Sequence, residues 1–257
     1  MKSARDELCA DWFDSPLGAR VWREETARVG AALDDVFGFE MLQVGVWGTS
    51  GALLSGARTQ HRSVVAPAAG PGVTLCAPLA SLPFASDTID GILLPHTLEL
   101  VEDPYAVLRE AERVLCAEGC LLICGFNPFS GWGARRLFAQ YLRRPAFPPG
   151  TRRLLSERRL RDWVALLGFD VYQTYGYMGV LPMAAGGASS TGARADGRTR
   201  PAWAAGAYLL KARKRVQTMT LIRPKRRARQ RILVAVPEPT TKTGSTSQTG
   251  PTTKAGT

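Results

Sequence analysis

The stretch LPFASDTIDGILLPHTLELVEDPYAVLREAERVLCAEGCLLICGFNP, residues 82–128, decides the fold class of this chain. It holds two short and almost continuously apolar runs, residues 88–95 and 119–126, each bounded by Gly, Pro or polar residues. Such runs are typical of strands buried in a parallel sheet. Between them, residues 103–115 repeat apolar side chains at helical spacing after an Asp-Pro start. The order strand, helix, strand predicts an α/β unit.

The same alternation continues on both sides of this stretch. Residues 18–38 have the apolar spacing of a helix, and Gly38 is a plausible stop. Further strands are predicted at 39–45, 62–67, 72–78, 169–177 and 204–215, and further helices at 131–144 and 156–168. The pattern predicts a doubly wound, mostly parallel seven-stranded sheet with helices on both faces. Because two strands follow each other at the end, we expect an antiparallel edge.

Charge divides the chain into two parts. The net charge is +11, yet the residues from Lys211 onward hold 12 basic residues and one acid, so the rest is neutral. The end of the chain is rich in Thr, Pro, Gly and Ser and cannot bury enough apolar surface to offset its ordering entropy. We therefore predict an N-terminal helical segment at 1–38, one domain at 39–215 and a disordered basic tail at 216–257.

Composition also narrows location and partners. No run approaches the roughly 18 apolar residues of a membrane span, and the start lacks a signal-like apolar core. Five cysteines without paired CxxC units favour a reducing, cytoplasmic location and give no metal site. Four arginine pairs within 131–161, and the basic segment 211–231, indicate either contact with nucleic acid or solvated charged faces.

A family resemblance rests on the same central stretch. Residues 82–128 resemble the second half of a class I S-adenosylmethionine-dependent methyltransferase domain of the type-11 kind. The matching features are the LPF segment, Asp90 inside the fourth strand, an HxLE…DP motif, and a Glu-Gly turn before the fifth strand. The opening WFDSPLGARVWREE is also similar to a set of uncharacterised proteobacterial methyltransferase-like proteins. The resemblance implies S-adenosylmethionine as cofactor and an unidentified methyl acceptor.

The resemblance also implies where the cofactor lies. In a doubly wound sheet, ligands bind beyond the carboxyl ends of the strands. On this basis Gly45, Gly48, Leu79 and His96 are expected to line the cofactor, and Asn127 to face the acceptor. The sequence identifies no catalytic residue, which suits methyl transfer, because positioning the acceptor can supply most of the catalysis.

The first half of the domain departs from the family pattern. Gln43 stands where an acid is common, and the family's acids after the second and third strands are replaced by Ala66-Pro67 and Ala77-Pro78. No Asp or Glu occurs between Met41 and Ser86. Carboxylates that bind ribose hydroxyls contribute charge-assisted hydrogen bonds of about 1.5–3 kcal/mol each. A second hypothesis is therefore a non-catalytic domain that kept the fold and acts as a binding or regulatory module.

Several residues keep two interpretations at this stage. His96 either lines the pocket or caps the fourth strand, and Asn127 either meets a substrate or forms a turn. Glu99 and Asp103 are expected to organise the turn and cap the next helix rather than act as bases. Cys120 and Cys124 lie in a buried strand, where core packing is the favoured account.

Overall fold

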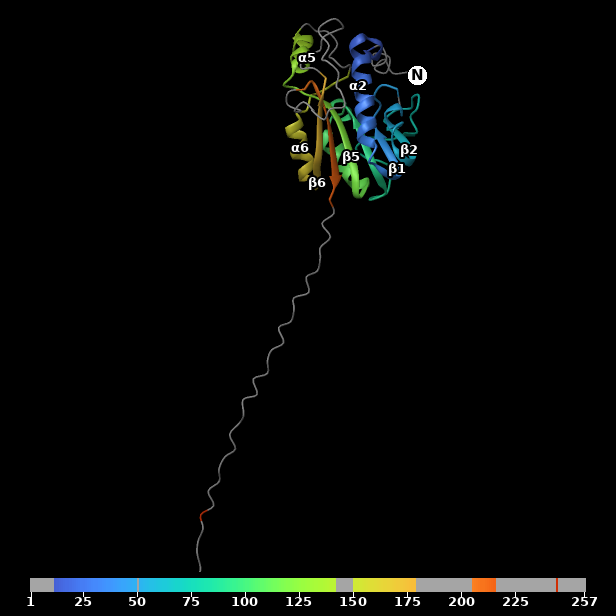
Figure 1. Cartoon of the computed structure of the whole chain (residues 1–257), viewed down its shortest axis with the longest axis vertical. Coiled ribbons are helices and arrows are strands. Elements are labelled where there is room, and N and C mark those ends of the chain that lie inside the picture. The colour runs from blue at the N-terminus through green and yellow to red at the C-terminus, as the bar shows by residue number, and fades with distance from the viewer. Residues whose placement is uncertain (1–11, 50, 142–149, 179–204, 216–243, 245–257) are drawn as a thin grey trace, which may run out of the picture. The chain divides into compact units, whose positions relative to one another are not determined.

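The computed structural model describes residues 12–49, 51–141, 150–178, 205–215 and 244. By its internal contacts the chain divides into two units, Met1–Gln217 and Thr218–Thr257. The fold described below belongs to the first unit (Figure 1).

A seven-stranded sheet forms the centre of this unit. The strands are β1 (Phe37–Val44), β2 (Arg58–Ala66), β3 (Leu75–Cys76), β4 (Ile89–Pro95), β5 (Leu115–Phe126), β6 (Phe169–Tyr177) and β7 (Ala207–Lys214). The helices are α2 (Pro16–Leu33), the 3₁₀ helix η1 (Ala52–Leu54), α3 (Thr97–Leu100), α4 (Pro104–Val114), α5 (Gly131–Tyr141) and α6 (Glu157–Leu166). The predicted α/β alternation is confirmed, with boundaries shifted by a few residues.

The strand order is β3-β2-β1-β4-β5-β7-β6. All neighbouring pairs from β3 to β5 are parallel, and β7 is antiparallel to both β5 and β6. The expected antiparallel edge is therefore confirmed: β6 forms this edge of the sheet, and β7 lies inside it. The physical reason is side-chain burial, because β7 is buried along almost its whole length whereas β6 exposes Tyr172 and Gln173 at its middle.

Two apolar clusters cover the two faces of the sheet. One contains the buried residues of α2, of η1 and of the start of α5. The other contains those of α4 and α6. Figure 1 shows α2 running along one face of the sheet. Residues 16–33 thus share a continuous core with the strands.

The helix starts follow from local sequence. Ser15 accepts a hydrogen bond from the backbone N–H of Gly18, and Pro16 takes the first position of α2. Asp103 caps α4 by accepting from the N–H groups of Tyr105 and Ala106, as the sequence predicts. Between β1 and β2, in contrast, the described part of the connection contains only the three-residue η1.

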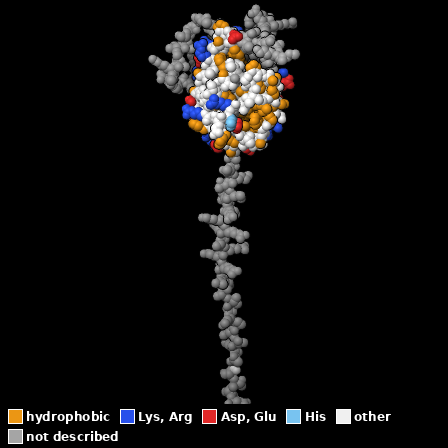
Figure 2. All heavy atoms as spheres, turned by 90° about the vertical axis from the view of Figure 1, so that its right-hand side faces the viewer, with side chains coloured by type: hydrophobic (Ala, Val, Ile, Leu, Met, Phe, Trp, Pro, Cys, Tyr) orange, Lys and Arg blue, Asp and Glu red, His pale blue; other side chains and the backbone are white. Residues whose placement is uncertain are grey.

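No helix in the described part of the chain is long and apolar enough to span a membrane. On the side of the molecule where β2 lies, Figure 2 shows apolar and uncharged atoms with scattered charged side chains. This face shows no continuous charged surface.

Candidate functional site

The loop after β1 lies against the turn after β4. Gly45 has a left-handed backbone (φ +93°), and a side chain there would meet Thr97 Oγ1 at 2.6 Å. The Thr97 hydroxyl donates a hydrogen bond of 2.5 Å to the carbonyl oxygen of Val44. Gly45 is thus required by close packing between two strand ends at the carboxyl edge of the sheet.

The same loop is held from its other side by α2. Gly48 is also left-handed (φ +61°), and a side chain there would meet the ring of Trp22 at 2.3 Å. Trp47 is buried and donates through its indole N–H to Glu25 Oε2 at 2.5 Å. Helix α2 therefore fixes the loop through one aromatic contact and one charge-assisted hydrogen bond.

Glu25 belongs to a fully buried ionisable group, which we call the Glu25–His96–Glu99 network. His96 Nε2 lies 2.6 Å from Glu25 Oε1, and His96 Nδ1 lies 2.9 Å from Glu99 Oε2. All three side chains are at most 2% exposed. The Tyr177 hydroxyl also donates to Glu25 Oε1, and the backbone N–H of Phe126 donates to Glu99 Oε1. Every carboxylate oxygen in the network accepts a hydrogen bond.

The electrostatics of the network follow from its burial. Burial alone would lower the pKa of His96, but the two carboxylates raise that pKa to about 9. Burial raises the pKa of Glu99, an effect that His96 opposes. Burial likewise raises the pKa of the nearby Cys124 thiol and of the Tyr177 hydroxyl. At neutral pH, His96 is therefore protonated and hydrogen-bonded to the side chains of Glu25 and Glu99.

Aromatic rings enclose the imidazole. The ring centroids of Trp47 and Phe126 each lie 4.2 Å from that of His96. Trp132 stacks on the far side of Phe126 at 5.2 Å. Because both faces and both nitrogens of His96 are covered, the side chain cannot itself contact a substrate in this conformation.

The structure does not bring all the expected site residues together. Asn127 is 4% exposed, donates to the carbonyl oxygen of Ala205 and accepts from the N–H of Phe129, so it forms the turn after β5. Leu79 is partly buried and packs against the opposite core cluster from Trp47. His96 does follow β4, in a left-handed conformation (φ +54°), and lies beside the loop of Gly45 and Gly48.

One buried polar atom at the carboxyl edge lacks a partner. Gln43 is completely buried, and its Nε2 donates to the carbonyl oxygen of Gly45. Its Oε1 is buried with no hydrogen-bond donor. An unpartnered buried acceptor of this kind costs about 1–3 kcal/mol.

The arginine-rich region is largely engaged within the protein. Arg152 pairs with Glu102, and Arg161 pairs with Glu157. Arg153 donates to the carbonyl oxygen of Glu102, Arg136 donates to backbone carbonyl oxygens, and Arg159 lies over the ring of Trp163. Contact of segment 131–161 with nucleic acid stays a prediction.

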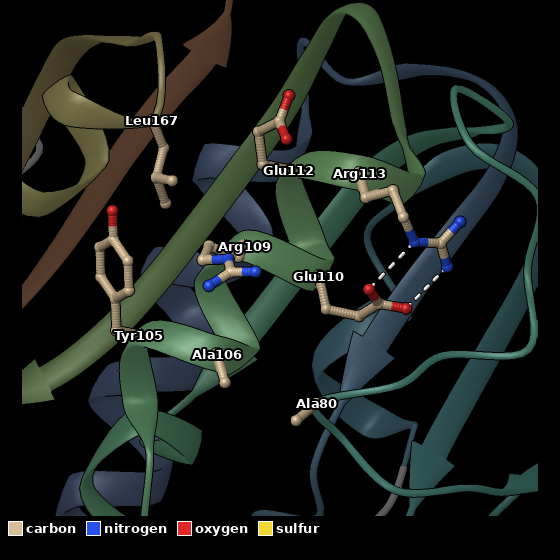
Figure 3. Close-up of a pocket in the computed structure, with 8 residues that line it drawn as sticks. All are labelled: Ala80, Tyr105, Ala106, Arg109, Glu110, Glu112, Arg113 and Leu167. Carbon is tan, nitrogen blue, oxygen red and sulfur yellow. Dashed lines mark hydrogen bonds and ion pairs between the residues drawn. The ribbon is translucent and has the colours of Figure 1, made fainter.

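A surface hollow lies away from this site. It is lined by Ala80, Tyr105, Ala106, Arg109, Glu110, Glu112, Arg113 and Leu167 (Figure 3). The Arg113 guanidinium also donates to the carbonyl oxygens of Leu82 and Phe84, and Glu110 accepts from the Leu82 N–H. These contacts fix the segment before β4 and explain the polar groups of the hollow.

Sequence reasoning missed Glu25, Trp47 and Tyr177. A signal for Glu25 is present, because it lies four residues from both Val21 and Val29 on the apolar stripe of α2. A carboxylate in such a stripe needs a buried partner. Among the described residues, no group of three or more His, Cys, Asp or Glu side chains is arranged to hold a metal ion.

Comparison with known proteins shows what part of this chain is similar to a known family. Residues 49–123 match the family model described as a methyltransferase domain. The uncharacterized protein YafS of Escherichia coli is 35% identical over 160 residues, which is 62% of this chain and 65% of that protein. The chain thus spans somewhat less than two thirds of the length of the curated relatives it matches.

Solved structures share the fold at low identity. A methyltransferase from Thermotoga maritima aligns with a TM-score of 0.61 and 19% identity, covering 80% of this chain and 93% of that one. A 1,6-didemethyltoxoflavin-N1-methyltransferase from Burkholderia thailandensis, solved with S-adenosylhomocysteine, aligns with a TM-score of 0.52 and 16% identity, covering 82% of this chain and 87% of that one. These likenesses concern the fold.

Proposed function

Because the chain carries a class I methyltransferase domain of the type-11 kind, we propose that it transfers a methyl group from S-adenosylmethionine to an acceptor. The observation that carries the proposal is the family-model match, which covers the η1 connection and strands β2 to β4 and most of β5. The relative from Burkholderia thailandensis that holds S-adenosylhomocysteine supports the same cofactor.

The loop after β1 fits the amino-acid end of this cofactor. Gly45, Gly48 and Gly51 all have left-handed backbones, which shape the loop at the strand end. The unpartnered Gln43 Oε1 could accept a hydrogen bond from an ammonium group. We infer that Gln43 takes the role of the acid that is common at this position.

The nucleoside end of the cofactor would be held without side-chain carboxylates. The second strand ends in Ala66, and Ala77 follows the third, so no side-chain carboxylate is available for ribose or adenine at these positions. In the described part of the connection after β1, the three-residue η1 stands where the family usually has a helix. Backbone groups and apolar side chains would hold the nucleoside, and we expect weaker binding than a ribose-binding carboxylate would give.

When bound, S-adenosylmethionine supplies a methyl group already activated by its positive sulfonium. The chain's own residues then bind and orient. The Glu25–His96–Glu99 network fixes the turn after β4. Trp47 and Thr97 fix the loop after β1 that carries Gly45, Gly48 and Gly51, which we call the glycine loop. Holding the acceptor in line with the methyl group supplies most of the catalysis in such a reaction.

Calorimetric titration of S-adenosylmethionine and S-adenosylhomocysteine into the full chain tests the proposal. Binding in the micromolar range supports it and justifies a search for the acceptor. No heat at millimolar ligand, with the protein shown to be folded by circular dichroism, would instead favour the non-catalytic module.

A variant in the loop after β1 tests whether the cofactor binds at this loop. Gly45→Arg is unsuitable, because even a Cβ at this position would clash with Thr97. Val46 is 41% exposed in the same loop, so Val46→Arg is expected to weaken both ligands at least tenfold while the fold is kept. Ala31→Arg, on the exposed side of α2, is the matched control and should bind like the unmodified chain.

We also propose a cytoplasmic location. Cys76, Cys116, Cys120 and Cys124 are free thiols. Such thiols are typical of reducing compartments. Fractionation of cells that express the full chain would test this.

A further inference from the structure

The Glu25–His96–Glu99 network carries a fixed formal charge. Two hydrogen bonds join the imidazole to the carboxylates, and each contains one proton. Moving either proton from nitrogen to oxygen leaves the total unchanged. The other donors to the carboxylate oxygens, on Trp47, Tyr177 and Phe126, are neutral groups that keep their own protons, so they add no charge. Two carboxylates and one imidazolium give a net charge of −1.

This charge lies directly under the glycine loop. Glu25 contacts the loop through the indole of Trp47, whose ring centroid lies 4.2 Å from that of His96. Glu99 reaches the end of β5 through the N–H of Phe126. The network therefore touches the loop after β1 and the ends of β4 and β5, which meet at the carboxyl edge of the sheet.

Other acids are missing from this region. Between Met41 and Ser86 the sequence contains no Asp or Glu, so the first three strands bring no carboxylate to the edge. Among the described residues, Glu25 and Glu99 are the buried carboxylates, and both belong to the network. Within the described part of the chain, they are therefore the buried carboxylates that can attract a cation at this edge.

We propose that the Glu25–His96–Glu99 network is an electrostatic selectivity element, which favours the positively charged sulfonium of S-adenosylmethionine over the neutral thioether of S-adenosylhomocysteine. The inference rests on the proposed function. Glu25 and Glu99 act here as positioning and charge-bearing residues, since neither is exposed to a ligand. Product release benefits, because the attraction is lost when the methyl group leaves with the positive charge.

Two arginine side chains lie near the network and act on its negative charge from outside the buried cluster. Arg28 on α2 lies over the ring of Tyr177 at 5.6 Å and is paired with Glu24. Arg136 on α5 is attracted by Glu99 and donates to backbone carbonyl oxygens of the segment before α6. Cys124 on β5, which is hydrogen-bonded to Tyr177, stays a neutral thiol. Both arginines lie outside the aromatic enclosure of His96, so the net negative charge remains beneath the loop.

The test compares two ligands that differ by one charge. The dissociation constants of S-adenosylmethionine and S-adenosylhomocysteine are measured by calorimetry for the full chain and for Glu25→Gln. One unit charge acting over a distance on the order of 10 Å, at an effective dielectric constant of about 20, changes a cation's affinity by roughly tenfold. We expect Glu25→Gln to weaken S-adenosylmethionine by about that factor and S-adenosylhomocysteine by less than about twofold.

Two controls separate charge from shape. Glu24→Gln removes the same charge from the same helix, but at a surface side chain that is 39% exposed, and should leave both affinities unchanged. Trp47→Phe breaks the contact to Glu25 without changing the charge, so it should weaken both ligands by the same factor. If Glu25→Gln does not fold, Glu99→Gln removes the charge from the other side of His96.

The outcomes are distinguishable. Equal weakening of both ligands by the Glu25→Gln and Glu99→Gln variants would show a purely structural role and overturn the inference while leaving the proposed function intact. If the unmodified, folded chain binds neither ligand, the proposed function fails, and the selectivity role fails with it.

Discussion

At the scale of single residues, His96 is expected to stay protonated well above neutral pH. The carboxylates of Glu25 and Glu99 overcome the effect of burial and raise its pKa to about 9. The chain has only two histidines, so nitrogen-detected NMR of ¹⁵N-histidine-labelled protein should show two pairs of ring-nitrogen signals. The pair that persists in His61→Gln should remain that of an imidazolium at pH 8. A neutral imidazole at pH 8 would contradict the geometry of the network.

The same shift predicts how stability depends on pH. Because the pKa of His96 is raised in the folded state from 6.5, its contribution is complete below pH 6.5 and is lost as the pH rises through about 9. The raised pKa of Glu99 acts with the same sign. At about 1.4 kcal/mol per pKa unit, His96 contributes roughly 3 kcal/mol that should be lost by pH 10. Urea unfolding at pH 6.5, 8 and 10 measures this.

A site residue could be predicted from the sequence when its hydrogen-bond partners are close to it in the chain. Asp103 caps α4 through neighbours two and three residues away, so its role follows from the Asp-Pro motif. His96 could be placed at the end of β4 beside Glu99, but its second partner could not be predicted, because Glu25 is 71 residues away in the sequence. Tyr177 lies 152 residues from Glu25 and has no local signal of its own.

At the scale of elements, the packing of α2 on the glycine loop can be tested with paired glycine variants. Gly48→Ala would place a Cβ 2.3 Å from Trp22 and also adopt a left-handed backbone. Gly51→Ala has the same backbone strain, but its nearest neighbour, Val64, is 3.8 Å away. Strain alone costs about 1–2 kcal/mol, and overpacking adds about 1–3 kcal/mol.

Denaturant unfolding of both variants should therefore show Gly48→Ala to be the less stable one by at least about 1 kcal/mol. The displaced Trp22 should also disturb the neighbouring contact between Trp47 and Glu25, which tryptophan fluorescence would report. Equal stabilities would mean that α2 does not restrain the loop.

The elements themselves were largely predictable because their apolar runs are local signals. The order of the last two strands was not, since it depends on which strand is buried on both faces. Ala207–Lys214 is almost fully buried although it contains Lys211 and Lys214. Lys211 is accommodated by Asp35 and the carbonyl oxygen of Ala32, and Lys214 by Asp87 and Glu112. These partners come from distant segments, so the sequence alone groups both lysines with the basic residues of the tail.

At the scale of the whole molecule, this pairing changes how the positive charge is distributed. Lys211, Arg213, Lys214 and Arg215 open the basic segment 211–231, yet each pairs with an acid of the first unit. The other six basic residues of this segment lie between residues 223 and 231, in the second unit and outside the described residues. A role in nucleic-acid binding would therefore depend on this shorter stretch.

Deleting residues 218–257 tests that role. The melting temperature should be unchanged, because residues 1–217 form a unit of their own. If the six basic residues contact phosphates, log K for duplex DNA should fall with log salt by about 0.9 for each contact, and the deletion should abolish most of that slope. Replacing the six residues by Gln in the full chain is the matched control for charge. If the shortened chain still binds DNA with the same salt dependence, the contact would instead be made by the arginines of 131–161. In that case their guanidinium groups must exchange the protein partners seen here for phosphates.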